Sequence, residues 1–167
     1  NFKNWLSCLP KSKSDKEAVL SFKNSRIENG LFSFINENKT DVKSSGKINF
    51  NDLFLTDLNF ESNETLIIND SITAQVDILS FAEKSGFIVD DFNSKQIEIS
   101  SNQISAKQLS LLALSSDLKL NELEFSFNDY ANFSKFTDSV QLVGDFNNAK
   151  LDLQNLEYSY QPFDSIN

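Results

Sequence analysis

Apolar residues recur along this chain in steps of two and three residues. In the segment from Gln103 to Phe127 the apolar positions are Ile104, Ala106, Leu109, Leu111, Leu118, Leu120, Leu123 and Phe125. A step of two is typical of a β-strand, because successive side chains point to opposite faces. A step of three shifts this phase by one residue, which a β-bulge absorbs while it bends the strand. The segment therefore predicts a hairpin of two kinked, amphipathic strands with a turn at Ser115-Ser116-Asp117.

The same pattern extends over most of the chain. Between Gly46 and Phe60 the positions that follow it are Ile48, Phe50, Leu53, Leu55, Leu58 and Phe60. Polar turn signals such as Asn69-Asp70-Ser71 and Glu83-Lys84-Ser85-Gly86 separate such segments. We predict a mainly β protein with a long antiparallel curved sheet, which forms an open groove with one apolar face.

Two segments have helical spacing instead. Phe2, Trp5, Leu6 and Leu9 form a short apolar stripe that Pro10 ends, and a charged linker follows. A second short helix is predicted over Asp129–Asp138. The expected organisation is a helix and linker over residues 1–17, followed by one curved β-sheet domain over residues 18–167. We expect this domain to be part of a longer, repeating β-groove.

Periodicity by itself leaves other arrangements open. An amphipathic sheet also suits a closed β-sandwich or a sheet covered by a helix, in which the apolar face is ordinary core. A pentapeptide-type solenoid is less suitable, because its coil needs small residues where this chain has Phe. One helix of about ten residues is too short to cover a sheet of about eight strands, which favours an apolar face that needs a partner.

Composition excludes several classes of partner. The 167 residues carry a net charge of -9, with a pI near 4.5. This charge argues against nucleic acid and against electrostatic docking on an anionic bilayer. No stretch approaches the roughly 20 apolar residues of a transmembrane helix. The chain does not begin with Met, so we expect it to be an internal portion of a longer protein.

The residues give little support for catalysis. With no His and only Cys8, the chain lacks an imidazole base and the ordinary zinc ligand sets. Its four glycines are isolated, so there is no phosphate-binding loop. Asp90 and Asp91 are adjacent and point to opposite faces of a strand, which prevents them from converging on one substrate. We expect no enzymatic activity, no metal and no cofactor.

The order of the patterned segments resembles a known family. The segments that carry the resemblance are Ile27–Phe34, Ser85–Phe87, Ile97–Ile99, Ile104–Leu111, Ser116–Leu120, Tyr130–Phe136 and Leu151–Leu156. Together they resemble TamB-type translocation and assembly proteins of the AsmA-like superfamily, in the form found in Bacteroidota. The resemblance covers most of the chain from about residue 20.

This resemblance implies a fragment of a large periplasmic protein that is anchored in the inner membrane. Such proteins conduct phospholipids between the inner and outer membranes and support outer-membrane protein assembly with an Omp85-type barrel as partner. The implied mechanism is passive, because acyl chains slide along an apolar groove while headgroups stay in water. A structural β-spacer and a sandwich-type adhesion module are the rival functions.

The phase of the apolar positions predicts which residues line the groove and contact phospholipid acyl chains. These residues are Ile48, Phe50, Leu53, Leu55, Ile97, Ile99, Ile104, Leu109, Leu111, Leu118, Leu120, Leu123 and Phe125.

Overall fold

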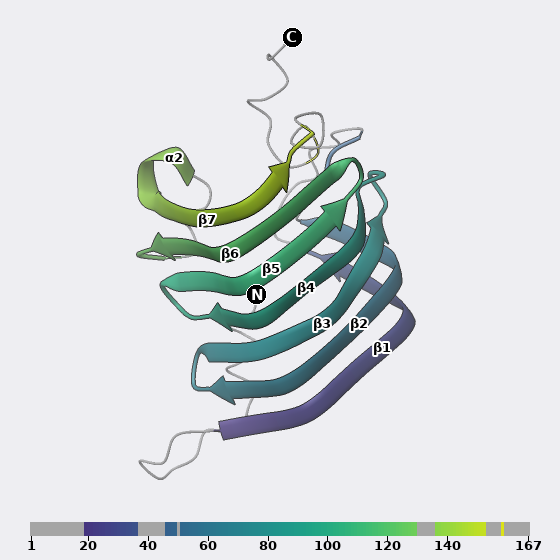
Figure 1. The fold of residues 1–167 in the computed structure, drawn as a ribbon. Helices are drawn as coiled ribbons and strands as arrows, with labels where there is room; N and C mark the ends of the chain where they lie inside the picture. Colours follow the sequence, from purple (N-terminus) through teal and green to yellow (C-terminus); the bar gives the residue numbers. More distant parts are fainter. Residues whose placement is uncertain (1–18, 37–45, 50, 130–135, 153–157, 159–167) are drawn as a thin grey trace.

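The computed structural model describes residues 19–36, 46–49, 51–129, 136–152 and 158. These residues form one antiparallel sheet in which each strand pairs with its neighbours in the sequence. Its elements are β1 (Val19–Ile35), β2 (Asp52–Ile68), β3 (Ser71–Glu83), β4 (Ile88–Ile99), β5 (Gln103–Ala113), β6 (Ser116–Phe127), α2 (Phe136–Ser139) and β7 (Val140–Lys150). The strands bow in a common direction, and β1 and β7 stay apart as the two edges of an open sheet (Figure 1). The predicted fold class is confirmed.

The hairpin predicted between Gln103 and Phe127 is present as β5 and β6. Its turn lies one to two residues earlier than predicted, at Leu114 and Ser115, and Ser116 already pairs with Ala113. Leu114 has a φ of 52°, the positive value that tight hairpin turns require. The turn propensity of Ser116 and Asp117 is overridden because pairing of Leu111 with Leu118 sets the register.

The three-residue steps are phase shifts within the strands. At Asp57, which lies between Leu55 and Leu58 with a φ of 52°, the register with β1 and β3 also shifts, as in a β-bulge. At Gln108, which lies between Ala106 and Leu109 with a φ of 47°, β5 stays in register with β4 and β6, so the expected β-bulge is absent there. At each step two consecutive residues face the polar side between two residues that face the apolar side. Regular alternation would place only one residue there. The extra residue lengthens only the polar face, so the strand bends toward the apolar face.

The phase shifts of neighbouring strands are aligned. In β4, β5 and β6 the unpaired residues Lys95, Gln108 and Asn121 lie opposite one another, and the register is the same before and after them. In β1 and β2, Lys23 and Glu64 lie opposite each other in the same way. All five side chains are polar and exposed. Aligned phase shifts bend the sheet along a line that crosses the strands, which makes it a trough (Figure 1).

The two- and three-residue pattern runs without a break from Gly46 to Phe60, but the structure does not form one continuous strand there, because β2 begins at Asp52. The residues before β2 form a turn, in which the Asp52 amide donates to the Asn49 carbonyl (3.0 Å) and the Asn51 amide donates to Asn49 Oδ1 (3.0 Å). Asparagine favours such side-chain-closed turns. The strand instead extends past Phe60 through a polar stretch to Ile68.

The helical predictions fall largely outside the described residues. Of the helix expected over Asp129–Asp138, residues 130–135 lie outside, Asp129 is in a bend, and α2 spans Phe136–Ser139. The helix and linker predicted over residues 1–17 also lie outside the described part of the chain.

Candidate functional site

The pairing register gathers most of the predicted lining residues on one face of the sheet. Directly paired residues share a face, and four pairs in β5 and β6 set it. These pairs are Ile104–Phe125, Ala106–Leu123, Leu109–Leu120 and Leu111–Leu118. In β4, Ile99 pairs with Ile104 and Ile97 pairs with Ala106, so both are on the same face. We call this the concave face, because the aligned phase shifts bend the sheet toward it, and the opposite side the convex face.

The remaining predicted residues come from the segment before and within β2. Leu55 pairs with Phe32 on one side and with Glu83 on the other, and Leu53 pairs with Phe34. Glu83 shares its face of β3 with Phe81, Phe81 pairs with Val89, and Val89 pairs with Ala113 of β5. Ala113 is on the concave face, so Leu53 and Leu55 are on that face as well. Ile48 precedes β2 and belongs to no strand, and Phe50 lies outside the described residues.

The deepest part of the concave face lies over β5 and β6. Ala106, Leu109 and Leu120 are buried to 4–7% exposure although the described residues form a single sheet. Half-buried side chains pack around them, namely Phe92, Ile97, Leu111, Leu118 and Leu123. Burial without a second sheet agrees with the bend, because a concave surface brings its own side chains together. This cluster is the apolar floor of the trough.

One row of paired residues runs along this floor from edge to edge. It consists of Ser25, Ser62, Val76, Ser94, Leu109, Leu120 and Phe146, each paired with the next. The row is apolar over β5 and β6 and carries hydroxyl groups over β1, β2 and β4. The floor is therefore lipophilic over one part of the trough and mixed over the other.

The serines of this row were not predicted from the sequence. Ser62 and Ser94 are the most buried side chains, at 1% and 2% exposure. The Ser94 hydroxyl lies 2.9 Å from the Lys107 carbonyl and 3.0 Å from the Gln96 carbonyl, so its hydrogen bond stays within the backbone beside the phase shift. Ser62 Oγ bonds Thr65 Oγ1 at 3.1 Å. A hydroxyl residue directly before a three-residue step, as in Ser62–Thr65 and Ser94–Ile97, is the signal that identifies them.

The convex face is mainly polar, with some exposed apolar residues such as Leu112 and Ile88, and its polar side chains bond to one another. Asp77 accepts hydrogen bonds from the side-chain amides of Asn63 and Gln75, the latter at 2.6 Å. Near the other edge, Asn121 donates to Asp145 (3.0 Å) and accepts from Asn147 (2.8 Å). The hydrogen-bonding groups of such a surface are satisfied by one another and by water. The two faces therefore differ sharply in chemistry.

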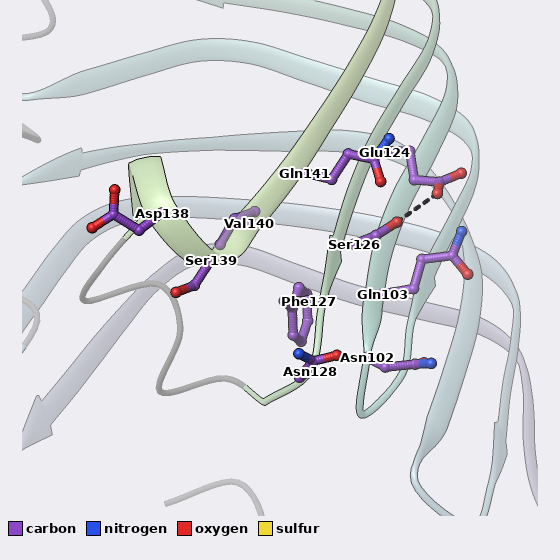
Figure 2. A pocket seen from close by; sticks show the side chains of 10 residues that line it. All are labelled: Asn102, Gln103, Glu124, Ser126, Phe127, Asn128, Asp138, Ser139, Val140 and Gln141. Carbon is purple, nitrogen blue, oxygen red and sulfur yellow. Dashed lines mark hydrogen bonds between the residues drawn. The ribbon is translucent and has the colours of Figure 1, made fainter.

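A separate polar pocket of about 720 Å³ lies where β5 begins, β6 ends and β7 begins (Figure 2). Its lining is Asn102, Gln103, Glu124, Ser126, Phe127, Asn128, Asp138, Ser139, Val140 and Gln141. Ser126 donates to Glu124 at 2.7 Å, shown by the dashed line in Figure 2. Gln103, Ser126 and Gln141 pair with one another out of phase with Ile104, so the pocket opens mainly on the convex side. Its described lining has no cation to hold a phosphate.

Comparison of the chain with protein-family models, with curated proteins and with solved structures gives no match. Within the described ranges, no three Cys, Asp or Glu residues are grouped to hold a metal ion. Nor does the described part of the chain contain a helix of the length and hydropathy that crossing a membrane requires. The concave face is thus the feature with the clearest chemistry, and that chemistry is apolar burial.

Proposed function

We propose that this chain is part of a periplasmic envelope-biogenesis protein of the AsmA-like type, and that its concave face conducts phospholipid acyl chains. The observation that carries the proposal is the shared face of the apolar residues of β4, β5 and β6 in an open, bent sheet. A conduit needs an apolar surface that stays accessible along one direction, and the described strands form one sheet instead of two packed sheets.

The dimensions of the trough suit an extended acyl chain. The floor row crosses seven strands, and six spacings of about 4.8 Å make it roughly 29 Å long. The roughly 30 Å hydrocarbon core of a bilayer holds two opposed acyl chains, so one chain spans about half the length of the floor. A methylene that moves from water onto the floor gains at most about 0.8 kcal/mol, the value for full burial. A chain lying on the floor is held mainly by non-directional contacts, which permit sliding.

The polar side chains fit the same role. The buried hydroxyl groups of Ser62 and Ser94 already bond within the protein, so they do not hold a headgroup. The convex face, with its Asn and Asp side chains, remains in water. In the full-length protein we place inner-membrane anchoring and the Omp85-type partner outside these strands. No catalytic step is required.

Lipid bound to the purified protein tests the proposal. We compare Leu111→Gln/Leu118→Gln, a cross-strand pair on the concave face, with Leu112→Gln/Ile88→Gln, two exposed apolar residues on the convex face. Native mass spectrometry after mild extraction should show bound phospholipid in the wild type and the convex-face variant, and a several-fold loss in the concave-face variant. Circular dichroism checks that each variant is folded.

Two results would contradict a conduit. A wild-type protein that carries no phospholipid and takes up no fluorescent fatty acid would favour a structural β-spacer. Equal lipid loss in both variants would show that the contact is not specific to the concave face.

A further inference from the structure

Exposed apolar side chains are concentrated on one edge of the sheet. Of the fifteen large hydrophobic residues that are exposed among the described residues, eight belong to β1. They are Val19, Leu20, Phe22, Ile27, Leu31, Phe32, Phe34 and Ile35. The central strands β5 and β6 contribute only Leu112 to this set. The concentration indicates a surface that another element covers.

The edge itself is suited to strand pairing. β1 has 17 residues and no proline, and within the described part of the chain it pairs only with β2. No described strand pairs with its other side, where the backbone amide and carbonyl groups of an edge strand can pair with a further strand. Long edge strands without proline are templates for such pairing.

The sequence of β1 is nearly symmetric about Ile27. Phe22 lies five residues before Ile27 and Phe32 lies five residues after it, and both share the face of Ile27. On each side the five residues are divided into one step of two and one step of three. These two residues are 47% and 45% exposed, and the next pair outward, Leu20 and Phe34, is 36% and 37% exposed. An antiparallel partner centred on Ile27 would therefore place apolar residues opposite apolar residues.

The charges next to Ile27 match this arrangement. Arg26 and Glu28 are both exposed on the convex face and form an ion pair at 2.6 Å within one strand. In an antiparallel pair centred on Ile27, Arg26 of each strand lies opposite Glu28 of the other. Opposite charges directly across an antiparallel pair are favourable, whereas like charges are not. The other edge lacks this match, because the central residue of β7 is Asp145, which would face itself.

We propose that two copies of this chain associate through β1, antiparallel, about a two-fold axis at Ile27 that is normal to the sheet. Such an axis reverses the strand direction and keeps both concave faces on the same side. The product is one sheet of 14 strands (7 + 7) with a continuous trough. This inference does not depend on what the concave face binds.

Charge reversal tests the register. For the intact protein, light scattering after size exclusion should give a dimer. Arg26→Glu and Glu28→Arg each place like charges opposite one another and should weaken the dimer at least tenfold. Asp145→Arg, on the other edge, is the control and should leave the dimer unchanged.

Mixing the two variants separates pairing between chains from effects within one chain. The Arg26→Glu chain carries two negative charges at these positions and the Glu28→Arg chain carries two positive ones. An equimolar mixture should form the dimer again, and the double variant Arg26→Glu/Glu28→Arg should dimerise by itself. A monomeric wild type, a mixture that stays monomeric, or a double variant that does not dimerise would overturn the proposal.

Discussion

Strands β6 and β1 are built from the same two- and three-residue steps, but their apolar side chains have different surroundings. Leu120 of β6 is 4% exposed, because β5 and β7 flank it and the bend of the sheet brings neighbouring side chains of the concave face against it. Among the described strands, β1 has a neighbour on one side only, and its Phe22 and Phe32 are 47% and 45% exposed. The step pattern therefore decides which face a residue joins, whereas the number of flanking strands decides how deeply it is buried.

The largest expected effect is a difference in stability between a central and an edge residue of the floor row. Leu120→Ala should lower the free energy of unfolding by about 2–5 kcal/mol, because it leaves a cavity in the floor. Its partner Phe146, on edge strand β7, is 57% exposed, and Phe146→Ala should cost about 0.5 kcal/mol or less. Urea denaturation of both variants measures the difference. Equal costs would mean that β7 is as well packed as the centre.

A middle-sized effect is expected at the phase shifts where the backbone has a positive φ. Gln108 has a φ of 47°, where a β-branched side chain is strained, so Gln108→Val should destabilise by about 1–2 kcal/mol. Asn29 has a φ of 48° in β1, and Asn29→Val should cost less because an edge strand relaxes more easily. Thermal unfolding of the two variants tests this order.

Glycine at the same position provides the control, because it adopts positive φ without strain. Gln108→Gly should leave the unfolding temperature nearly unchanged. A valine variant as stable as the glycine variant would show that the left-handed backbone conformation at Gln108 does not affect stability.

The smallest effect concerns the buried hydroxyl groups. Ser94→Ala removes the hydrogen bond to the Lys107 carbonyl and should cost about 1 kcal/mol. Ser25, in the same row on β1, is only half-buried, and Ser25→Ala should change stability by a few tenths of a kcal/mol. Chemical denaturation resolves the two cases, and a larger loss for Ser25→Ala would reverse the expected order.

Much of the local structure follows from the sequence. The phase of Ile104 to Phe125 predicts the hairpin, the face of each residue and the phase shift at Gln108, because steric alternation and the cost of burying polar groups act over a few residues. The expectation of a β-bulge at that step is wrong, because β4, β5 and β6 shift phase together and stay in register. Strand ends are less well predicted. Asn49 closes a turn that delays β2 to Asp52, and the polar residues from Glu61 to Thr65 still extend that strand because β1 and β3 pair with it.

The candidate site shows the same division. The sequence predicts the lining residues of β4, β5 and β6, and pairing places them together. It does not predict the buried serines, because their burial depends on a bend that several strands make jointly. By itself the sequence determined the amphipathic strands and their phase shifts, which are local consequences of backbone geometry. Only the tertiary structure decided that the phase shifts align, that the sheet stays open, and that β1 and β7 are its edges, because these depend on pairing between residues far apart in the chain.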